Sequence, residues 1–162
     1  LQYIQQFNQS EMLKDIPILC MNLTADAMIK YYMGIAVNKG IDFRTKLTIP
    51  EEISINPVDL SVILGNCIEN AINACDKLCN GESKYIVIIS NVIGSQLIIK
   101  IKNSFNGLIK KDGDAFMSLS REGRGIGITS LIATAGKYKG DVDIRYDHTE
   151  FQVNIILPLE EK

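Results

Sequence analysis

The chain has 162 residues, of which 46% are hydrophobic and 22% are charged, and its formal net charge is −2. This length fits one domain with a substantial buried core, and the scattered lysines and arginines form no basic stripe that would indicate nucleic-acid binding. No apolar run approaches the roughly 20 residues that cross a bilayer, and the chain begins with Leu1. We therefore expect a piece of a longer protein from which upstream sequence, including any membrane part, has been removed.

The N-terminal part of the chain predicts two helical segments and one strand. Residues 1–21 are assigned to the weakly periodic end of an upstream helix and a linker. A helix is expected from about 24 to 39, with Asn22 or Thr24 as its N-cap. Alternation of apolar and polar residues then predicts a half-buried strand over 41–49.

The middle of the chain contains the most informative helix. It is expected over 57–78, where apolar residues recur at helical spacing after Pro57. Two strands follow, 85–93 and 96–103, and a tight turn joins them. Residues 104–124 have no sustained period, and so long a connection in a compact domain is usually functional. We expect this connection to be a lid.

The C-terminal part of the chain predicts one helix and a hairpin. The helix is expected over 126–138, and two strands over 142–146 and 150–157 turn at residues 147–149. The full order of elements indicates an α+β fold. It is an α/β sandwich in which a mixed, mostly antiparallel sheet of about five strands carries helices on one face.

The helix expected over 57–78 has one apolar flank and one amide flank. At about 100° per residue, three asparagines and a lysine share one narrow sector. They are Asn66, Asn70, Asn73 and Lys77, and the opposite sector holds Leu64, Ile68, Ala71 and Cys75. Asparagine in a helix interior costs roughly half a kcal/mol relative to alanine. Three aligned asparagines therefore favour a functional surface over a solvated one, which would draw Lys, Glu, Gln and Arg.

Carboxamide side chains suit a nucleotide that is bound together with a metal ion. The oxygen of an asparagine side chain is a hard ligand for Mg²⁺, and its NH₂ group can donate to phosphate. Glu69 lies on the same polar side of the helix. A supporting role beside the metal ligand and simple solvation fit Glu69 equally well.

A glycine-rich turn stands directly before the helix expected over 126–138. Its glycines are Gly123, Gly125 and Gly127. Converging backbone N–H groups and a helix N-terminus favour an anion there, although a flexible connection is the commoner reason for such a turn. The spacing matches neither the Rossmann nor the P-loop pattern. Arg121 and Arg124 flank the glycines and are candidate charge-assisted donors to the β- and γ-phosphates.

These motifs occur in the order of the N, G1 and G2 boxes of the GHKL ATPases, which include gyrase, Hsp90, histidine kinases and MutL. The matching positions are Asn66-x₃-Asn70-Ala71, the strand-ending Asn103, and Gly123-Arg-Gly-Ile-Gly127. Over about residues 22–158 the chain resembles the histidine-kinase branch. The segments DLSVILGNCIENAINAC, IKNS, SREGRGIGITS and FQVNIILP resemble Agr-type peptide quorum-sensing receptor kinases. The resemblance implies the Bergerat fold and an ATP-binding catalytic domain over 22–162, with an ATP lid at about 104–124.

The resemblance also implies a role for each matching residue. Asn70 is expected to ligate Mg²⁺, Asn66 and Asn73 to contact phosphates, and the three glycines to shape the base of the lid. The candidate ligands of ATP are Asn66, Asn70, Asn73, Lys77, Asn103, Gly123, Arg124, Gly125, Ile126 and Gly127, and the candidate catalytic residues are Asn66, Asn70 and Arg121.

Two departures from the family pattern bear on activity. Most members carry an aspartate at the position of Asn103, where it accepts a hydrogen bond from the adenine amino group. A carboxamide oxygen accepts the same bond without charge, so we expect weaker nucleotide affinity. The ATP-hydrolysing members carry a glutamate at the position of Asn66 as the base for water. Asparagine cannot accept that proton, so we expect slow hydrolysis.

The resemblance therefore implies the catalytic domain of a two-component sensor histidine kinase, which transfers the γ-phosphoryl group of ATP to a histidine on a dimerisation domain. The expected setting is the cytoplasmic domain of a membrane-anchored receptor that is a homodimer at full length and signals to a response regulator. The alternatives are a degenerate module that binds ATP without catalysis and a GHKL ATPase or clamp.

The histidine and cysteine content supports no other chemistry. The only histidine, His148, falls at the tip of the expected C-terminal hairpin beside acidic residues, where a solvated turn residue is expected rather than a phosphoacceptor. The cysteines show no paired framework and no metal-ligand spacing. They are Cys20, Cys67, Cys75 and Cys79, and we expect buried free thiols in a reducing cytoplasm.

Overall fold

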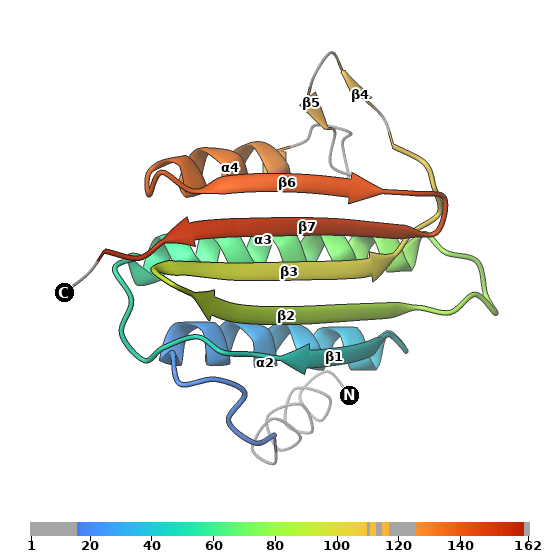
Figure 1. Ribbon diagram of the computed structural model, residues 1–162. Coiled ribbons are helices and arrows are strands. Elements are labelled where there is room, and N and C mark those ends of the chain that lie inside the picture. The colour runs from blue at the N-terminus through green and yellow to red at the C-terminus, as the bar shows by residue number, and fades with distance from the viewer. Residues whose placement is uncertain (1–15, 110, 113–114, 117–125, 161–162) are drawn as a thin grey trace.

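Figure 1 shows the computed structural model of the chain, which describes residues 16–109, 111–112, 115–116 and 126–160. Helices cover one face of a sheet, and the other face of the sheet is turned toward the viewer. The described helices are α2 (Leu23–Asn38), α3 (Pro57–Asp76) and α4 (Ile126–Gly136). The strands of this sheet are β1 (Asp42–Lys46), β2 (Tyr85–Ile93), β3 (Gln96–Ser104), β6 (Asp141–Tyr146) and β7 (Glu150–Pro158). The predicted α+β fold with helices on one face is confirmed.

The sheet is mixed, as predicted. Its spatial order is β1-β2-β3-β7-β6. Strand β1 pairs with β2 in parallel, while the other neighbouring pairs are antiparallel. The chain between β1 and β2 contains α3, because a parallel pair needs a crossover connection whereas antiparallel strands can be joined by a short turn.

The starts of the helices follow from local capping. The side chain of Asn22 accepts a hydrogen bond from the backbone N–H of Ala25 at 3.0 Å, which selects Asn22 over Thr24 as the cap of α2. Asn56 does the same for Val58 at 2.8 Å, one residue before the proline that opens α3. Such caps satisfy backbone donors that have no partner within the helix.

Several predicted boundaries are wrong by a few residues. Helix α3 ends at Asp76 rather than at residue 78, and α4 ends at Gly136 rather than at residue 138. The strand expected over 41–49 keeps regular pairing with β2 only up to the pair Lys46 and Ile89. Periodicity does not mark these ends, because the residues beyond them still alternate or recur in the same pattern.

The segment expected to be an irregular lid contains a second, two-stranded sheet. Strands β4 (Lys111–Asp112) and β5 (Ala115–Phe116) pair antiparallel. This hairpin was missed, because two residues per strand are too few to show a period of two.

None of the described helices is both long and apolar enough to cross a membrane.

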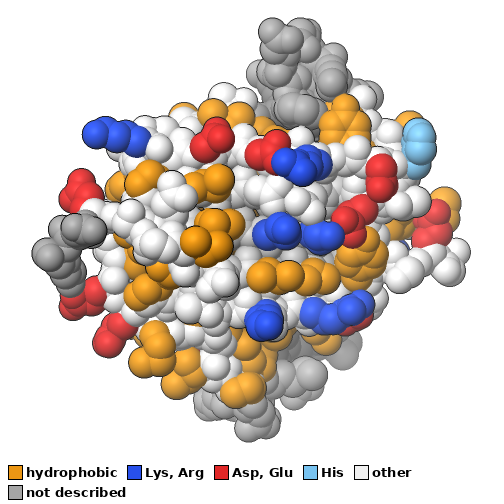
Figure 2. All heavy atoms as spheres, viewed as in Figure 1, with side chains coloured by type: hydrophobic (Ala, Val, Ile, Leu, Met, Phe, Trp, Pro, Cys, Tyr) orange, Lys and Arg blue, Asp and Glu red, His pale blue; other side chains and the backbone are white. Residues whose placement is uncertain are grey.

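The core lies between the sheet and the helices. Aliphatic side chains dominate it, and the largest fully buried ones are Ile29, Leu60, Ile63, Leu64, Ile68, Ile86, Ile88, Leu97, Ile99, Ile101, Leu131 and Ile155. The opposite face of the sheet carries none of the described helices, and Figure 2 shows lysine and arginine side chains gathered over its strands among apolar ones. The helix layer is therefore the side on which a buried binding site can form.

Four residues after the end of α4, at Gly140, the backbone approaches the sheet so closely that only glycine fits. A Cβ atom built on Gly140 would lie 2.8 Å from the carbonyl oxygen of Ile156 and 3.0 Å from that of Ala135. Both atoms belong to the backbone, so neither can give way cheaply. We expect Gly140→Ala to lower the free energy of unfolding by about 2 kcal/mol in urea denaturation. Gly136→Ala is the control, because nothing lies within 4 Å of its added Cβ, and equal stability of the two variants would contradict the prediction.

Candidate nucleotide-binding site

Helix α3 lies between α2 and α4 and turns its two predicted flanks in different directions (Figure 1). The apolar flank is buried in the core, as predicted, and consists of Leu64, Ile68, Ala71 and Cys75. Asn66, Asn70 and Asn73 are half-buried, so these asparagines do not form a fully solvated stripe. Lys77 is exposed and follows the helix as its C-cap residue.

The amide flank meets the first turn of α4. A Cβ atom built on Gly127 would lie 3.1 Å from Nδ2 and 3.3 Å from Oδ1 of Asn70, which is tighter than ordinary van der Waals contact. Glycine at 127 therefore lets the backbone of α4 approach the carboxamide of Asn70. The structure brings together the central asparagine of α3 and the last glycine of the predicted turn, 57 positions later in the sequence.

The rest of the glycine-rich turn lies outside the described residues. This applies to Arg121, Gly123, Arg124 and Gly125, and to the side chain of Ile126. Ile126 itself is the first residue of α4. The roles expected for these five residues stay predictions.

Asn103 lies near the end of β3, on the face of the sheet that the helices cover. It is 3% exposed, and its Nδ2 donates a hydrogen bond to the carbonyl oxygen of Ser104 at 2.9 Å. The thiol of Cys75 on α3 lies 3.4 Å from Oγ of Ser104. The C-terminal part of α3 therefore lies over the strand end that carries Asn103.

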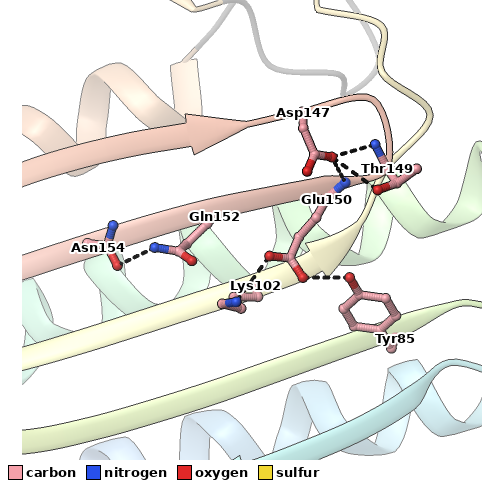
Figure 3. Close-up of polar contacts among 7 residues, drawn as sticks. All are labelled: Tyr85, Lys102, Asp147, Thr149, Glu150, Gln152 and Asn154. Carbon is pink, nitrogen blue, oxygen red and sulfur yellow. Dashed lines mark hydrogen bonds and ion pairs between the residues drawn. The ribbon is translucent and has the colours of Figure 1, made fainter.

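A polar network on the helix-free face holds this end of the sheet together (Figure 3). The hydroxyl of Tyr85 on β2 donates to Oε2 of Glu150 on β7 at 2.7 Å, and Lys102 on β3 approaches Oε1 at 3.1 Å. Burial, together with the hydrogen bond and negative charge of Glu150, raises the pKa of Tyr85 to about 12, so the hydroxyl keeps its proton. Three strands are thus joined where Asn103 is positioned, since Asn103 pairs with Ile86 and Phe151.

The loop after β3 is anchored by an aromatic cluster that the sequence did not predict. Phe105 is buried, with its ring centroid 5.7 Å from that of Phe151 and 6.4 Å from that of Tyr146. Gly107 has a φ of +77°, and a Cβ atom on it would lie 3.0 Å from the carbonyl oxygen of His148. The start of the expected lid is therefore packed on the β6–β7 hairpin. The burial of Phe105 could not be predicted from the sequence, because this residue lies in a segment without periodicity.

The cysteines and the histidine offer no second candidate centre. Cys20, Cys67 and Cys75 are buried, as predicted, and burial raises the pKa of Cys67 to about 12. The prediction is wrong for Cys79, which is exposed because α3 ends three residues before it. His148 is exposed at the hairpin tip, as predicted.

The residues that the structure describes fit a magnesium ion held mainly by its substrate. They contain no group of three or more His, Cys, Asp or Glu side chains able to hold a metal ion. Mg²⁺ in nucleotide sites usually keeps several waters and takes one or two protein oxygens beside the phosphates. The carboxamide oxygen of Asn70, close to the first turn of α4, is a ligand of this type.

Comparison with known proteins identifies the domain family. The sequence model of the GHKL domain family matches residues 55–158, which is more than half of the chain. A comparison with curated protein sequences found no significant match.

Three solved structures of low sequence identity share the fold. The blue-light activated histidine kinase of Erythrobacter litoralis EL346 aligns at 16% identity and a TM-score of 0.61, covering 85% of this chain and 65% of that one. The catalytic domain of histidine kinase ThkA aligns at 17% identity and a TM-score of 0.61, covering 83% and 94%. Full-length ShkA in complex with AMPPNP aligns at 15% identity and a TM-score of 0.63, covering 84% and 30%.

The chain thus spans 65% of the length of the Erythrobacter structure and matches the ThkA catalytic domain over nearly all of that domain's length. The shared fold and the family match together identify what kind of domain this is. The chain belongs to the GHKL domain family and has the fold of the ATP-binding catalytic domains of histidine kinases.

Proposed function

We propose that this chain is the catalytic domain of a two-component sensor histidine kinase and transfers the γ-phosphoryl group of ATP to a histidine on a dimerisation domain. One observation carries the proposal, which is the contact between Gly127 at the start of α4 and Asn70 on α3. It sets the N-terminus of a helix, which favours anions, beside a carboxamide oxygen, which favours Mg²⁺. A metal-bound triphosphate is a ligand that suits both.

The three asparagines of α3 bind the triphosphate of ATP and its metal ion, which we call the polyphosphate end of the site. Asn70 holds Mg²⁺, which neutralises charge on the phosphate oxygens when it is bound. Asn66 and Asn73, which lie about one turn away on either side, donate their NH₂ groups to phosphate oxygens. Arg121 and Arg124 supply charge-assisted donors from the lid, and Lys77 lies at the end of the same flank.

Asn103 binds the adenine end. Its Nδ2 already donates to the carbonyl oxygen of Ser104, which orients the carboxamide. The carboxamide oxygen is then the atom that accepts a hydrogen bond from the adenine amino group. Because this acceptor carries no full charge, we expect an affinity below that of relatives with a carboxylate at this position.

The site favours phosphoryl transfer over hydrolysis. Asn66 stands where a base for water would be needed, and a carboxamide does not accept a proton at neutral pH. Transfer to an imidazole requires mainly positioning and charge neutralisation. The acceptor in this proposal is a histidine of another domain. The only histidine of this chain, His148, lies exposed at the tip of the β6–β7 hairpin, where we expect a solvated turn residue.

The wider setting follows from the resemblance to Agr-type kinases. The parent protein would be a membrane-anchored, peptide-sensing receptor, homodimeric at full length, with this domain in the cytoplasm and a response regulator downstream. The family match supports the ATP-binding part of this proposal. The receptor context rests on the sequence segments that resemble that subfamily.

The proposal is tested by an ATP titration followed by a transfer assay. Calorimetric titration of the chain with ATP should show binding that strengthens when Mg²⁺ is added. Addition of the histidine-bearing dimerisation domain of the same receptor and labelled ATP should then give an acid-labile phosphohistidine. Asn70→Ala is the negative control for the Mg²⁺ effect.

Three other results of these experiments would contradict the proposal or favour a different function. Absence of ATP binding would overturn the proposal altogether. Binding without any transfer would favour a non-catalytic ATP-sensing module. Steady multiple-turnover hydrolysis by the chain alone would favour an ATPase or clamp, because it would require a base that Asn66 does not supply.

A further inference from the structure

Helices α3 and α4 run antiparallel and contact each other at both ends. At one end Gly127 lies against Asn70. At the other end Tyr138, just after α4, contacts Asp59 in the first turn of α3. The two contacts are eleven positions apart along each segment, from Asp59 to Asn70 and from Gly127 to Tyr138. A helix rises 1.5 Å per residue, so roughly 16 Å separates the two contacts along α3.

The second contact is a cluster of directional polar bonds, which we name the Tyr138 clamp. The hydroxyl of Tyr138 donates to Oδ2 of Asp59 at 2.6 Å and accepts from the backbone N–H of Asn56 at 3.0 Å. The ammonium of Lys137 lies 3.0 Å from Oδ1 of Asp59. The hydrogen bond from Tyr138 and then that from Lys137 lower the pKa of Asp59, so the carboxylate stays ionised at neutral pH.

Part of the contact that α4 makes with the core is apolar. Leu131 and Ala135 are buried in the core, and apolar contacts of this kind are non-directional. Hydrogen bonds are directional and weaken steeply when they are misaligned. The Tyr138 clamp therefore adds a directional restraint against a shift of α4 along α3, and Gly127 is at the end of α4 that such a shift would move off Asn70.

We propose that Tyr138 and Asp59 are positioning residues, which fix α4 along α3 so that Gly127 stays against Asn70 and the polyphosphate end of the site keeps its shape. The consequence for ligand binding rests on the proposed function, while the mechanical coupling between the two ends of α4 does not. The adenine end at Asn103 belongs to β3 and not to α4, so we expect a shift of α4 to leave it in place.

The test uses the whole chain with Tyr138→Phe, which removes only the hydroxyl. We expect its affinity for Mg²⁺-ATP to fall about three- to tenfold, while its affinity for adenosine stays that of the wild type. If Tyr138 only stabilised the fold, the variant would lose affinity for Mg²⁺-ATP and for adenosine to the same extent. Asp59→Ala should reproduce the loss, and Asp59→Asn should largely restore binding, since its carboxamide oxygen still accepts from Tyr138. Tyr31→Phe, which removes an exposed hydroxyl from α2, is the control.

Hydrogen exchange of the ligand-free chain tests the mechanical part separately. Tyr138→Phe should speed exchange of the amides at residues 128–131, at the opposite end of α4 from the lost hydroxyl. Faster exchange confined to residues 135–139, or wild-type affinity for Mg²⁺-ATP in Tyr138→Phe, would overturn the inference. A wild-type chain that binds no ATP, combined with faster exchange at 128–131 in the variant, would refute the proposed function but support the clamp.

Discussion

Asn70→Ala should remove the effect of Mg²⁺ on ATP binding, so that titrations with and without the ion give the same affinity. The side chain is half-buried against α4 and supplies the carboxamide oxygen that we assign to the metal. Loss of a polar contact to a charged ligand typically costs 1.5–3 kcal/mol, which corresponds to a loss of about ten- to a hundredfold in affinity for Mg²⁺-ATP. Calorimetry at matched ionic strength measures this change.

Asn38→Ala is the matched control for this substitution. It removes the same carboxamide from the last residue of another helix, α2, where the side chain is exposed. Its affinity and its Mg²⁺ dependence should equal those of the wild type. An unchanged Mg²⁺ effect in Asn70→Ala would remove the asparagine flank of α3 from the site.

Gly127→Ala should weaken Mg²⁺-ATP binding about tenfold without destabilising the fold. The added Cβ would lie 3.1 Å from Nδ2 of Asn70, and this atom is the end of a side chain that can move aside by a few tenths of an ångström. The fold therefore tolerates the methyl group, and we expect the stability to stay close to that of the wild type. The displaced carboxamide no longer meets the metal in the same place. Thermal unfolding and calorimetry together should show a nearly unchanged stability and a lower affinity.

Gly136→Ala is a control that separates the effect of an added methyl group on α4 from its effect on ATP binding. It adds the same methyl group to the last residue of the same helix, where no atom lies within 4 Å of it. Its ATP affinity should stay at the wild-type value. In the Asn70→Ala background, Gly127→Ala should have little further effect on affinity, because the two changes act on one contact. Equal ATP affinity of Gly127→Ala and Gly136→Ala would show that the close approach has no role in binding.

Local patterns in the sequence were sufficient to predict the helices, the strands of the five-stranded sheet and the two faces of α3, but not the hairpin of β4 and β5. Helical periodicity correctly separated Asn66, Asn70 and Asn73 from the buried flank, because the position of a residue around a helix depends only on its own spacing. The tight turn between β2 and β3 was equally local, whereas the sequence left Asn22 and Thr24 open as the cap of α2 and the structure selected Asn22. The ends of β1 and α3 were misplaced, since the pattern continued past the last regular backbone pairing.

Apart from the short hairpin of β4 and β5, the sequence by itself therefore determined the kinds of element, their order, and which flank of α3 is polar. Its motifs carried the resemblance to GHKL domains that the family match bears out. Only the tertiary structure decided that Gly127 meets Asn70, that Phe105 packs on Phe151, and that Tyr138 reaches Asp59 across 79 positions of the chain. Such contacts join segments far apart in the sequence, and no periodicity within one segment records which other segment it will pack against. They form only when burial of the apolar faces brings the elements together.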